Sequence, residues 1–358
     1  QISQFQINEI NRLAITLVEQ LSEKTLYDYQ KRILCRINKA IFNNEGANIA
    51  ISVSRQAGKT EAVTGSAVFL ALCYFRLCAE YGIQCHDTFN MGFFGPKEDQ
   101  PRTDFNRVKE YLLRAQKYGL PVVFDTFNGQ TITIVVKGMP KIEIMCMSAS
   151  PTAHVESKTL NLIFLEEAHD IIDFKVKNAI LPMGTSTNAT SVFIGPAGYR
   201  RCLFKKYLDE SSAENKIVVP YQDVIKERRR VYEITGNSTH LNYETFMNIE
   251  AKRLGTGDDA FKTQYELQWV LEHGQFITYE ELLHLESNHT VSTRGQVYDK
   301  PVMVGIDWGK AHDSTVLTAV NENYEIIAMY EWQGDDYDSQ INEIAQILQN
   351  DFRSILRV

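Results

Sequence analysis

The sequence lacks paired cysteines, long apolar runs and an excess of positive charge, and each absence excludes a class of protein. Its six cysteines form no Cys-x-x-Cys pair. Cys85 and His86 are adjacent, but no further ligands follow at finger-like spacing, so we reject a zinc site there. Most of the cysteines have apolar neighbours, which favours reduced core thiols in a reducing compartment. They are Cys35, Cys73, Cys78, Cys85, Cys146 and Cys202.

The apolar runs are too short to cross a membrane. The longest lies around Ala67–Tyr74, whereas a spanning helix needs roughly 20 residues, so no membrane partner is expected. The formal net charge of −8 argues against a general attraction to nucleic acid and leaves any DNA contact to local basic clusters. Each of two such clusters, taken alone, is more simply a solvated helix face. They comprise Arg200, Arg201, Lys205 and Lys206, and Lys226, Arg228, Arg229 and Arg230.

Composition and periodicity predict an α/β protein. The 358 residues, 44% hydrophobic and 23% charged, have an ordinary globular balance and suffice for two domains. Strand-like runs alternate with helical runs, which implies a mostly parallel sheet covered by helices. Helices are expected over residues 5–22, 27–43, 59–80 and 104–117, and strands over 47–51, 91–95, 130–136, 142–147, 160–165, 191–195 and 216–219.

A phosphate-binding loop is the most specific motif. Residues 53–60 have the sequence Val-Ser-Arg-Gln-Ala-Gly-Lys-Thr and lie between a strand-like and a helix-compatible run. In such a loop the backbone N–H groups surround a β-phosphate, Gly58 permits close approach, Lys59 neutralises the β/γ oxygens and the Thr60 hydroxyl holds Mg²⁺. Val53 stands where the standard motif has Gly, so the loop is a variant. By itself, Gly-Lys-Thr is equally compatible with an ordinary helix start after a turn.

Two adjacent acids form a second nucleotide motif. Glu166 and Glu167 follow the buried-strand run over 160–165. A carboxylate at the carboxyl end of a central strand can hold Mg²⁺ through water, while its neighbour polarises the attacking water in phosphoryl transfer. We assign Glu166 to the metal and Glu167 to the water. Acids after a strand are otherwise common helix caps, but a phosphate loop about a hundred residues upstream favours the nucleotide interpretation.

The pattern becomes helical and highly charged over residues 223–281. Phe261, Tyr265 and Trp269 recur at i, i+4 and i+8, which predicts one aromatic packing stripe on a helix. The following polar stretch suits a connection between domains. We therefore predict an ATPase-like domain over 1–222, a helical linker over 223–286 and a further domain over 287–358.

An acid-bearing strand meander begins the last part. An apolar run from Val302 leads into Asp307 and Gly309, and two more strand-like runs follow over 315–320 and 324–332. Ribonuclease H-like nucleases place a metal ligand on the first strand of such a meander, where carboxylates gather around two divalent ions. Asp307 is the candidate ligand. A strand-ending Asp that caps a turn is an equally good interpretation of this segment alone.

Taken in order, these motifs resemble the large terminase subunit of tailed bacteriophages, a DNA-packaging motor with an amino-terminal ATPase and a carboxy-terminal nuclease. Residues 54–60 look like its variant phosphate loop, in which an Arg ahead of Gly-Lys-Ser/Thr is typical. Gln30 looks like its adenine-recognising Gln, and residues 195–198 look like its coupling motif. Glu166-Glu167 departs from the usual Asp-Glu, and Ile194-Gly195 departs from the usual hydroxyl residue before the proline.

The resemblance implies a P-loop ATPase of the ASCE type, a helical linker and an incomplete ribonuclease H-like nuclease. Glu167, Arg55 and Asp307 would be catalytic, with Arg55 as an arginine finger supplied in cis. Gly195 and Pro196 would couple hydrolysis to movement. ATP and its Mg²⁺ would bind Gln30, Ser54, Arg55, Gln56, Ala57, Gly58, Lys59, Thr60 and Glu166, with Thr60 and Glu166 at the metal.

The resemblance also implies partners and a place of action. The motor would translocate double-stranded DNA into a procapsid, as a homo-oligomeric ring on the portal, with the small terminase subunit, in the host cytoplasm. The nuclease would use Mg²⁺ or Mn²⁺ at Asp307. The chain stops after a helix expected near 341–349 and before a further acid-bearing strand, so weak or no DNA cleavage is expected.

Two other functions stay open. Glu166-Glu167-Ala168-His169 resembles the signature of DEAH-box helicases, although no second recombinase-like domain with arginine fingers follows. A nucleotide-dependent scaffold that does not hydrolyse ATP is the other alternative, because the Asp-Glu pair is replaced. Strand displacement separates the helicase from the motor, and steady-state ATP turnover separates the scaffold from both.

Overall fold

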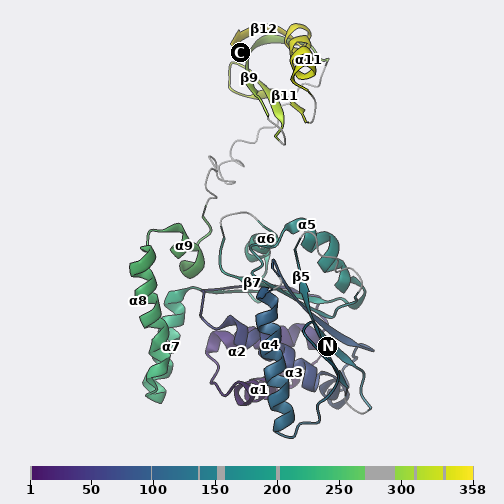
Figure 1. Cartoon of the computed structure of the whole chain (residues 1–358), viewed down its shortest axis with the longest axis vertical. Coiled ribbons are helices and arrows are strands. Elements are labelled where there is room, and N and C mark those ends of the chain that lie inside the picture. The colour runs from purple at the N-terminus through teal and green to yellow at the C-terminus, as the bar shows by residue number, and fades with distance from the viewer. Residues whose placement is uncertain are drawn as a thin grey trace. The chain divides into compact units, whose positions relative to one another are not determined.

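A computed structural model gives the fold of the chain (Figure 1). It describes residues 2–97, 99–135, 138–150, 158–198, 202–270, 295–309, 313–333 and 336–357. The chain divides into two compact units, Gln1–Gln275 and Phe276–Val358. The predicted boundary at residue 287 lies outside the described residues, so the three-part division stays a prediction.

The described residues of the first unit form an eight-stranded sheet in the order β3-β4-β5-β2-β6-β7-β1-β8. The pairs β3-β4 and β4-β5 are antiparallel and the other pairs are parallel, which confirms a mostly parallel sheet. Sequence analysis missed β3, because this edge strand buries none of its residues completely. The strands are β1 Asn48–Val53, β2 Phe89–Gly95, β3 Val123–Phe127, β4 Thr131–Val135, β5 Ile142–Ser148, β6 Leu162–Glu166, β7 Thr190–Gly195 and β8 Lys216–Val219.

Helices cover both faces of this sheet (Figure 1). Strand residues alternate between two apolar clusters: Ile49 and Ile51 pack with α1 to α4, whereas Ala50 packs with α5 and α6. This is the period of two that a doubly covered strand requires. The helical elements are α1 Gln4–Ser22, α2 Asp28–Phe42, α3 Lys59–Tyr81, α4 Asp99–Lys117, the short α5 Asp173–Lys175 with the irregular turns Val176–Ile180 and Leu181–Thr187, and α6 Leu203–Glu210.

Helix α3 is the central helix of the first unit. By length and composition it could cross a membrane, but 78% of its most apolar window is buried inside the protein. A helix that is hydrophobic on all sides is typical of a protein core as well as of a membrane. Its amino terminus carries Lys59 and Thr60, so the core helix fixes the position of the phosphate loop.

The last part of the first unit is helical, as predicted, but its three aromatic residues do not form the single stripe that was predicted. Phe261 and Tyr265 do pack together, with ring centroids 5.2 Å apart. The helix ends at Leu267, whose φ of 61° is left-handed, so Trp269 leaves that face and contacts Phe204 instead. The elements are α7 Tyr221–Thr235, the turn Ser238–Leu241, α8 Asn242–Leu254, α9 Asp259–Phe261 and the π-turn Lys262–Glu266.

The second unit contains a four-stranded sheet in the order β11-β10-β9-β12. Strands β9 to β11 form an antiparallel meander, and β12 pairs with β9 in parallel after the helix α11. Strand β12 was not predicted, because Arg353, Ser354 and Arg357 interrupt its apolar residues. It carries no acid, so the expectation that the chain stops before a further acid-bearing strand stays a prediction. The elements are β9 Tyr298–Asp307, β10 Thr315–Val320, β11 Ile326–Trp332, α11 Tyr337–Asn350 and β12 Phe352–Arg357.

Candidate nucleotide site

The phosphate loop connects β1 to α3 in the predicted way. Gly58 is the residue before α3 and has a φ of 87°, a value that favours glycine. A Cβ at this position would lie 2.9 Å from Nε2 of Gln30. Gln56 also has a left-handed φ, of 58°, so two turns of the backbone curl the loop over the amino terminus of α3. The first N–H groups of a helix have no partner within it and favour an anion.

Side chains from distant elements hold the carbonyl groups of the loop. The Ala57 carbonyl accepts hydrogen bonds from the Tyr29 hydroxyl at 2.5 Å and from Nη2 of Arg228 at 3.1 Å. Gln30 donates from Nε2 to the Gly58 carbonyl at 2.7 Å and accepts from the Tyr27 N–H at 2.9 Å. Both ends of the Gln30 amide are thus engaged, and its contact with adenine stays a prediction.

Arg228 is a loop contact that sequence analysis missed. Its guanidinium lies between the rings of Tyr27, at 4.8 Å, and Tyr243, at 4.7 Å. Nothing in the basic cluster that contains Arg228 indicated this contact, because the neighbouring basic residues lie at the surface. Arg229, for example, pairs with Glu244. The two aromatic faces hold the charge against the loop. Arg200 and Arg201, of the other basic cluster, lie outside the described residues.

We expect Arg228→Met to lower the free energy of unfolding by about 2 kcal/mol, since it removes two ring contacts and one hydrogen bond. Arg229→Met is the matched control, because it removes only an exposed ion pair, which contributes little to stability. Urea unfolding of the whole chain compares the two variants. Equal loss of stability in both would show that Arg228 does not support the loop.

Arg55 and Ser54 are tied to the helical part of the first unit. The Arg55 N–H donates to the Gln264 carbonyl at 2.9 Å, and Nη1 of Arg55 donates to Oε1 of Gln264 at 2.7 Å. The Ser54 hydroxyl lies 2.7 Å from the Tyr243 hydroxyl. The Arg55 side chain is exposed and close enough to Glu167 for its charge to act on that carboxylate. The loop is therefore linked to the segment that follows α8.

Lys59 and Glu167 meet across the site. Lys59 Nζ lies 2.6 Å from Oε1 of Glu167. Burial raises the pKa of Glu167, but the charge of Lys59 and its hydrogen bond outweigh burial and leave the pKa below its ordinary value. Burial likewise lowers the pKa of Lys59, and the charges of Glu167 and Glu166 outweigh it in the upward direction. Both groups are ionised at neutral pH.

Glu167 is held in a strained backbone conformation. Its φ of 49° is left-handed, which is uncommon for a residue with a side chain and is typical of functional sites. The strain turns the chain sharply after β6, so the side chains of Glu166 and Glu167 diverge. Glu167 reaches Lys59, while Glu166 stays at the end of the strand inside the protein.

Glu166 is almost completely buried, with 3% of its surface exposed, and within the described part of the chain no donor reaches its Oε1. Burial and the nearby Asp104 carboxyl raise its pKa well above the ordinary range. Asp104, on α4, is within hydrogen-bonding reach of both Glu166 and Thr60. Asp104 was not predicted, because the local sequence pattern of a helix does not show which of its residues faces the end of a strand that is distant in the chain.

These groups line one cavity of about 410 Å³, a size typical of small-molecule sites. Carboxylate and hydroxyl oxygens are the donors that Mg²⁺ prefers, and the Glu166 Oε1 that lacks a donor fits a cation at that position. The lining joins seven predicted residues, Arg55, Gln56, Lys59, Thr60, Glu166, Glu167 and Pro196, with six that were not predicted, Gln100, Thr103, Asp104, His169, Asp170 and Gln264.

The predicted coupling segment packs against the turn that follows Glu166 and Glu167. A Cβ at Gly195 would lie 2.9 Å from Nδ1 of His169, and one at Gly198 would lie 3.3 Å from the same ring and from Trp269. The Ala168 N–H donates to the Ile194 carbonyl at 2.9 Å. Only glycine fits against His169 here, so the segment packs closely on the turn that carries Glu167. Its coupling role stays a prediction.

Asp307 stands at the end of β9 in the second unit and is exposed. Asp307 and Glu331 both pair with Val316, from opposite sides of β10, so all three residues share one face of the sheet. Glu331 accepts a hydrogen bond from Ser314 at 2.5 Å. Within the described residues, no three His, Cys, Asp or Glu side chains are grouped so that they could hold a metal ion. Metal binding by Asp307 stays a prediction.

The first unit is an α/β fold in which the loop between β1 and α3 and the carboxylates at the end of β6 line one cavity. Among solved structures, the large terminase ATPase domain of Thermus phage P74-26 matches it with a TM-score of 0.52 and 17% identity, over 70% of this chain and 97% of that chain. An arginine-to-alanine mutant of that domain gives 0.51 over the same shares. The chain therefore has the fold of a phage large terminase ATPase domain.

A third similar structure is longer. The large terminase from a thermophilic bacteriophage, solved in complex with ATP-gamma-S, is 17% identical and covers 93% of this chain and 77% of its own, with a TM-score of 0.48. A scan against models of protein families gives no match, and neither does a search of curated proteins.

Proposed function

We propose that the chain hydrolyses ATP and that hydrolysis drives the movement of double-stranded viral DNA into a procapsid. The observation that carries the ATPase proposal is the Lys59–Glu167 contact of 2.6 Å at the mouth of the phosphate loop. It brings the two sequence motifs, separated by more than a hundred residues, to one point. The fold of the terminase ATPase domain supports the motor proposal.

Each residue then has a task in phosphoryl transfer. Lys59 leaves Glu167 and neutralises the β/γ oxygens of ATP, which frees the Glu167 carboxylate to orient and deprotonate the attacking water. Arg55, exposed at the edge of the cavity, stabilises the charge on the γ-phosphoryl group. Thr60 and Glu166 would hold Mg²⁺. When bound there, Mg²⁺ would act as a Lewis acid that neutralises the charge developing on the phosphate groups.

Steady-state ATP turnover by the whole chain tests this proposal. We expect Lys59→Met to abolish turnover, and Lys206→Met, which alters an exposed helix residue, to leave it unchanged. Turnover should rise when linear double-stranded DNA is added. No turnover under any of these conditions would favour the non-hydrolysing scaffold, and separation of duplex strands would favour the helicase.

We propose that the motor binds DNA through phosphate groups and not through base edges, because a packaging motor must accept any sequence. Binding to any duplex should weaken steeply as salt rises, and the slope of the logarithmic plot should be the same for unrelated sequences. Filter binding or fluorescence anisotropy measures that slope. A shallow slope, or a strong preference for one sequence, would argue against phosphate contacts.

We further propose that the chain forms a homo-oligomeric ring on the portal, has a small terminase subunit as partner and acts in the host cytoplasm.

We also propose that the second unit derives from a ribonuclease H-like nuclease, with Asp307 as a divalent metal ligand. The meander and the parallel β12 support this, because parallel neighbours bring their carboxyl ends to the same edge of a sheet. Since the described residues contain no group of three His, Cys, Asp or Glu side chains that could hold a metal ion, we expect weak or no plasmid cleavage with Mg²⁺ or Mn²⁺. Robust cleavage that Asp307→Ala abolishes would contradict this expectation.

A further inference from the structure

Asp104 belongs to neither nucleotide motif, yet it lies in the same cavity. It is 4% exposed and stands within hydrogen-bonding reach of Glu166, the strand-end acid, and of the Thr60 hydroxyl. It comes from α4, which follows β2, so it approaches the site from a different element than the phosphate loop. Three oxygen-bearing side chains from three elements therefore converge behind Lys59.

This convergence is unfavourable for the protein alone. Two carboxyl groups removed from water repel each other when ionised, and burial of a charge without a partner is costly. Lys59 offers partial relief, but its Nζ is bonded to Glu167. Oε1 of Glu166 is buried, and no donor in the described structure satisfies it. A hard cation is the partner that such a set of oxygens lacks.

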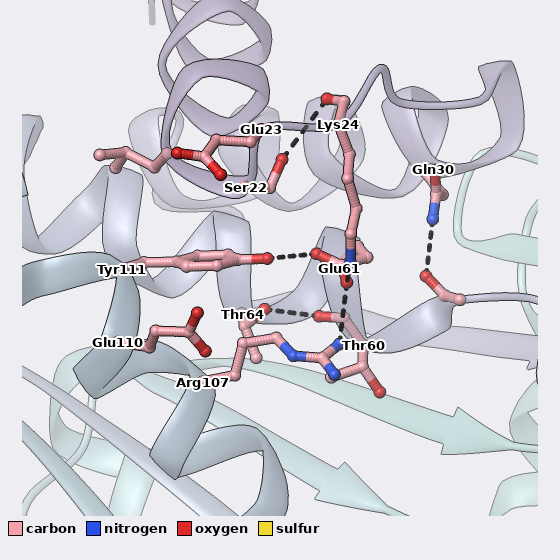
Figure 2. Close-up of polar contacts among 12 residues, drawn as sticks. Ser22, Glu23, Lys24, Gln30, Thr60, Glu61, Thr64, Arg107, Glu110 and Tyr111 are labelled. Carbon is pink, nitrogen blue, oxygen red and sulfur yellow. Dashed lines mark hydrogen bonds and ion pairs between the residues drawn. The ribbon is translucent and has the colours of Figure 1, made fainter. Parts of the chain in front are cut away.

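The side chains around Glu61 hold α4 in this position (Figure 2). Glu61 follows Thr60 in α3 and is 6% exposed. It accepts hydrogen bonds from Lys24 Nζ at 2.6 Å, from Arg107 Nη1 at 3.0 Å and from the Tyr111 hydroxyl. Arg107 and Tyr111 lie three and seven residues after Asp104, on the same side of α4.

Helix α4 is therefore hydrogen-bonded to Glu61, the residue that follows Thr60 in α3. Burial raises the pKa of Glu61, but the hydrogen bonds of Lys24 and Tyr111 and the charge of Arg107 outweigh burial and lower it. Glu61 is thus a fixed negative charge at the centre of the contact between α3 and α4. Its place beside Thr60 sets the distance from the start of α3 to Asp104.

We propose that Asp104 is a third oxygen donor to the divalent cation, together with Thr60 and Glu166, and that Glu61 is a positioning residue for it. This inference rests on the proposed function, since the cation is the one that accompanies ATP. It assigns a binding residue to α4, outside both nucleotide motifs. Because α4 is bonded through Glu61 to the start of α3, cation binding joins the two helices at the phosphate loop.

The test uses the whole chain and two probes, Mn²⁺ alone and ADP with or without Mg²⁺. We expect Asp104→Asn to weaken Mn²⁺ binding, followed by electron paramagnetic resonance, by about 10–100-fold. ADP binding in the presence of a chelator should stay within a few-fold, so only the Mg²⁺-dependent gain in affinity should fall. Asp99→Asn, in the exposed first turn of the same helix, is the matched control and should change neither.

Thermal unfolding adds a readout that a purely structural role of Asp104 would not produce. Without metal, Asp104→Asn should raise the unfolding temperature, because it removes one of two facing carboxyl groups. With metal, wild type should gain stability and the variant should not. Unchanged Mn²⁺ affinity, or a variant that is less stable without metal, would overturn the inference. A wild-type chain that binds Mn²⁺ but no ADP would contradict the proposed function and leave the cation site standing.

Glu61→Gln tests the positioning role separately. It keeps the size of the side chain but removes the charge that faces Lys24 and Arg107. We expect a several-fold loss of the Mg²⁺-dependent gain in ADP affinity, with affinity in chelator unchanged. Tyr111→Phe removes a single hydrogen bond and should show a smaller loss of the same kind. If affinity falls equally with and without Mg²⁺, Glu61 supports the loop in general and not Asp104.

Discussion

Glu167→Gln is expected to lower ATP turnover by about 10²–10⁴-fold, the usual contribution of a general base, while ATP binding stays intact or becomes tighter. Glutamine keeps the shape of the side chain but cannot accept the proton of the attacking water. It also cannot form the ion pair that holds Lys59 at 2.6 Å, so Lys59 is released for the phosphates. Single-turnover kinetics and calorimetric titration measure the two effects.

The control for this experiment is Glu210→Gln, which alters an exposed acid at the end of α6. It should leave both turnover and affinity unchanged. If Glu167→Gln turns over ATP within a few-fold of wild type, Glu167 is not the base, and the Lys59–Glu167 contact would be a structural ion pair.

Arg55→Ala is expected to lower turnover by about 10³–10⁵-fold at saturating ATP, the range measured for arginine fingers, with ADP affinity within a few-fold of wild type. The structure gives the reason for this split: Arg55 is exposed at the cavity edge, whereas Lys59 and the start of α3 lie deeper. Arg55→Lys should restore little, because an ammonium group lacks the planar fork of the guanidinium.

Gln264→Ala separates the catalytic role of Arg55 from a structural one. This variant removes the side-chain partner of Arg55 at 2.7 Å but keeps the backbone hydrogen bond from the Arg55 N–H. We expect turnover close to that of wild type, since the guanidinium must leave Gln264 to reach the γ-phosphate. Equal and severe loss in Gln264→Ala and Arg55→Ala would show that Arg55 acts by holding the loop.

The sequence was sufficient to predict how the central site is assembled. A strand followed by a Gly-Lys-Thr loop and a strand followed by Glu-Glu both end at the carboxyl edge of a parallel sheet, and there the structure brings Lys59 and Glu167 together. The order of the strands in the sheet was harder to predict from the sequence. Strand β7 lies between β6, which carries the acids, and β1, which leads into the phosphate loop.

The supporting residues could not be predicted, because their partners are distant in the chain. Asp104 follows no motif, and Arg228 looked like one of several surface charges until α7 was seen to pack beside the loop. The prediction that Trp269 shares a helix face with Phe261 and Tyr265 was wrong for another reason. The i, i+4, i+8 pattern assumes a continuous helix, and the helix ends at Leu267. Periodicity predicts which face is apolar and does not reveal where a short helix stops.

The second unit shows the same division. The first strand, its acid and the meander follow from alternating apolar residues, and all three are present in the structure. Strand β12 was missed since Arg353 and Arg357 dilute its apolar pattern. Whether further acids join Asp307 is a question of side chains from separate elements, which local sequence patterns do not answer.

A crystal structure of the chain with Mg²⁺ and a slowly hydrolysed ATP analogue tests the central assignment most directly. The analogue should occupy the cavity between the start of α3 and the two glutamates, with Lys59 moved from Glu167 onto the terminal phosphates and the cation in contact with Thr60. An analogue bound elsewhere, or a Lys59–Glu167 pair that persists beside an empty cavity at saturating nucleotide, would contradict it.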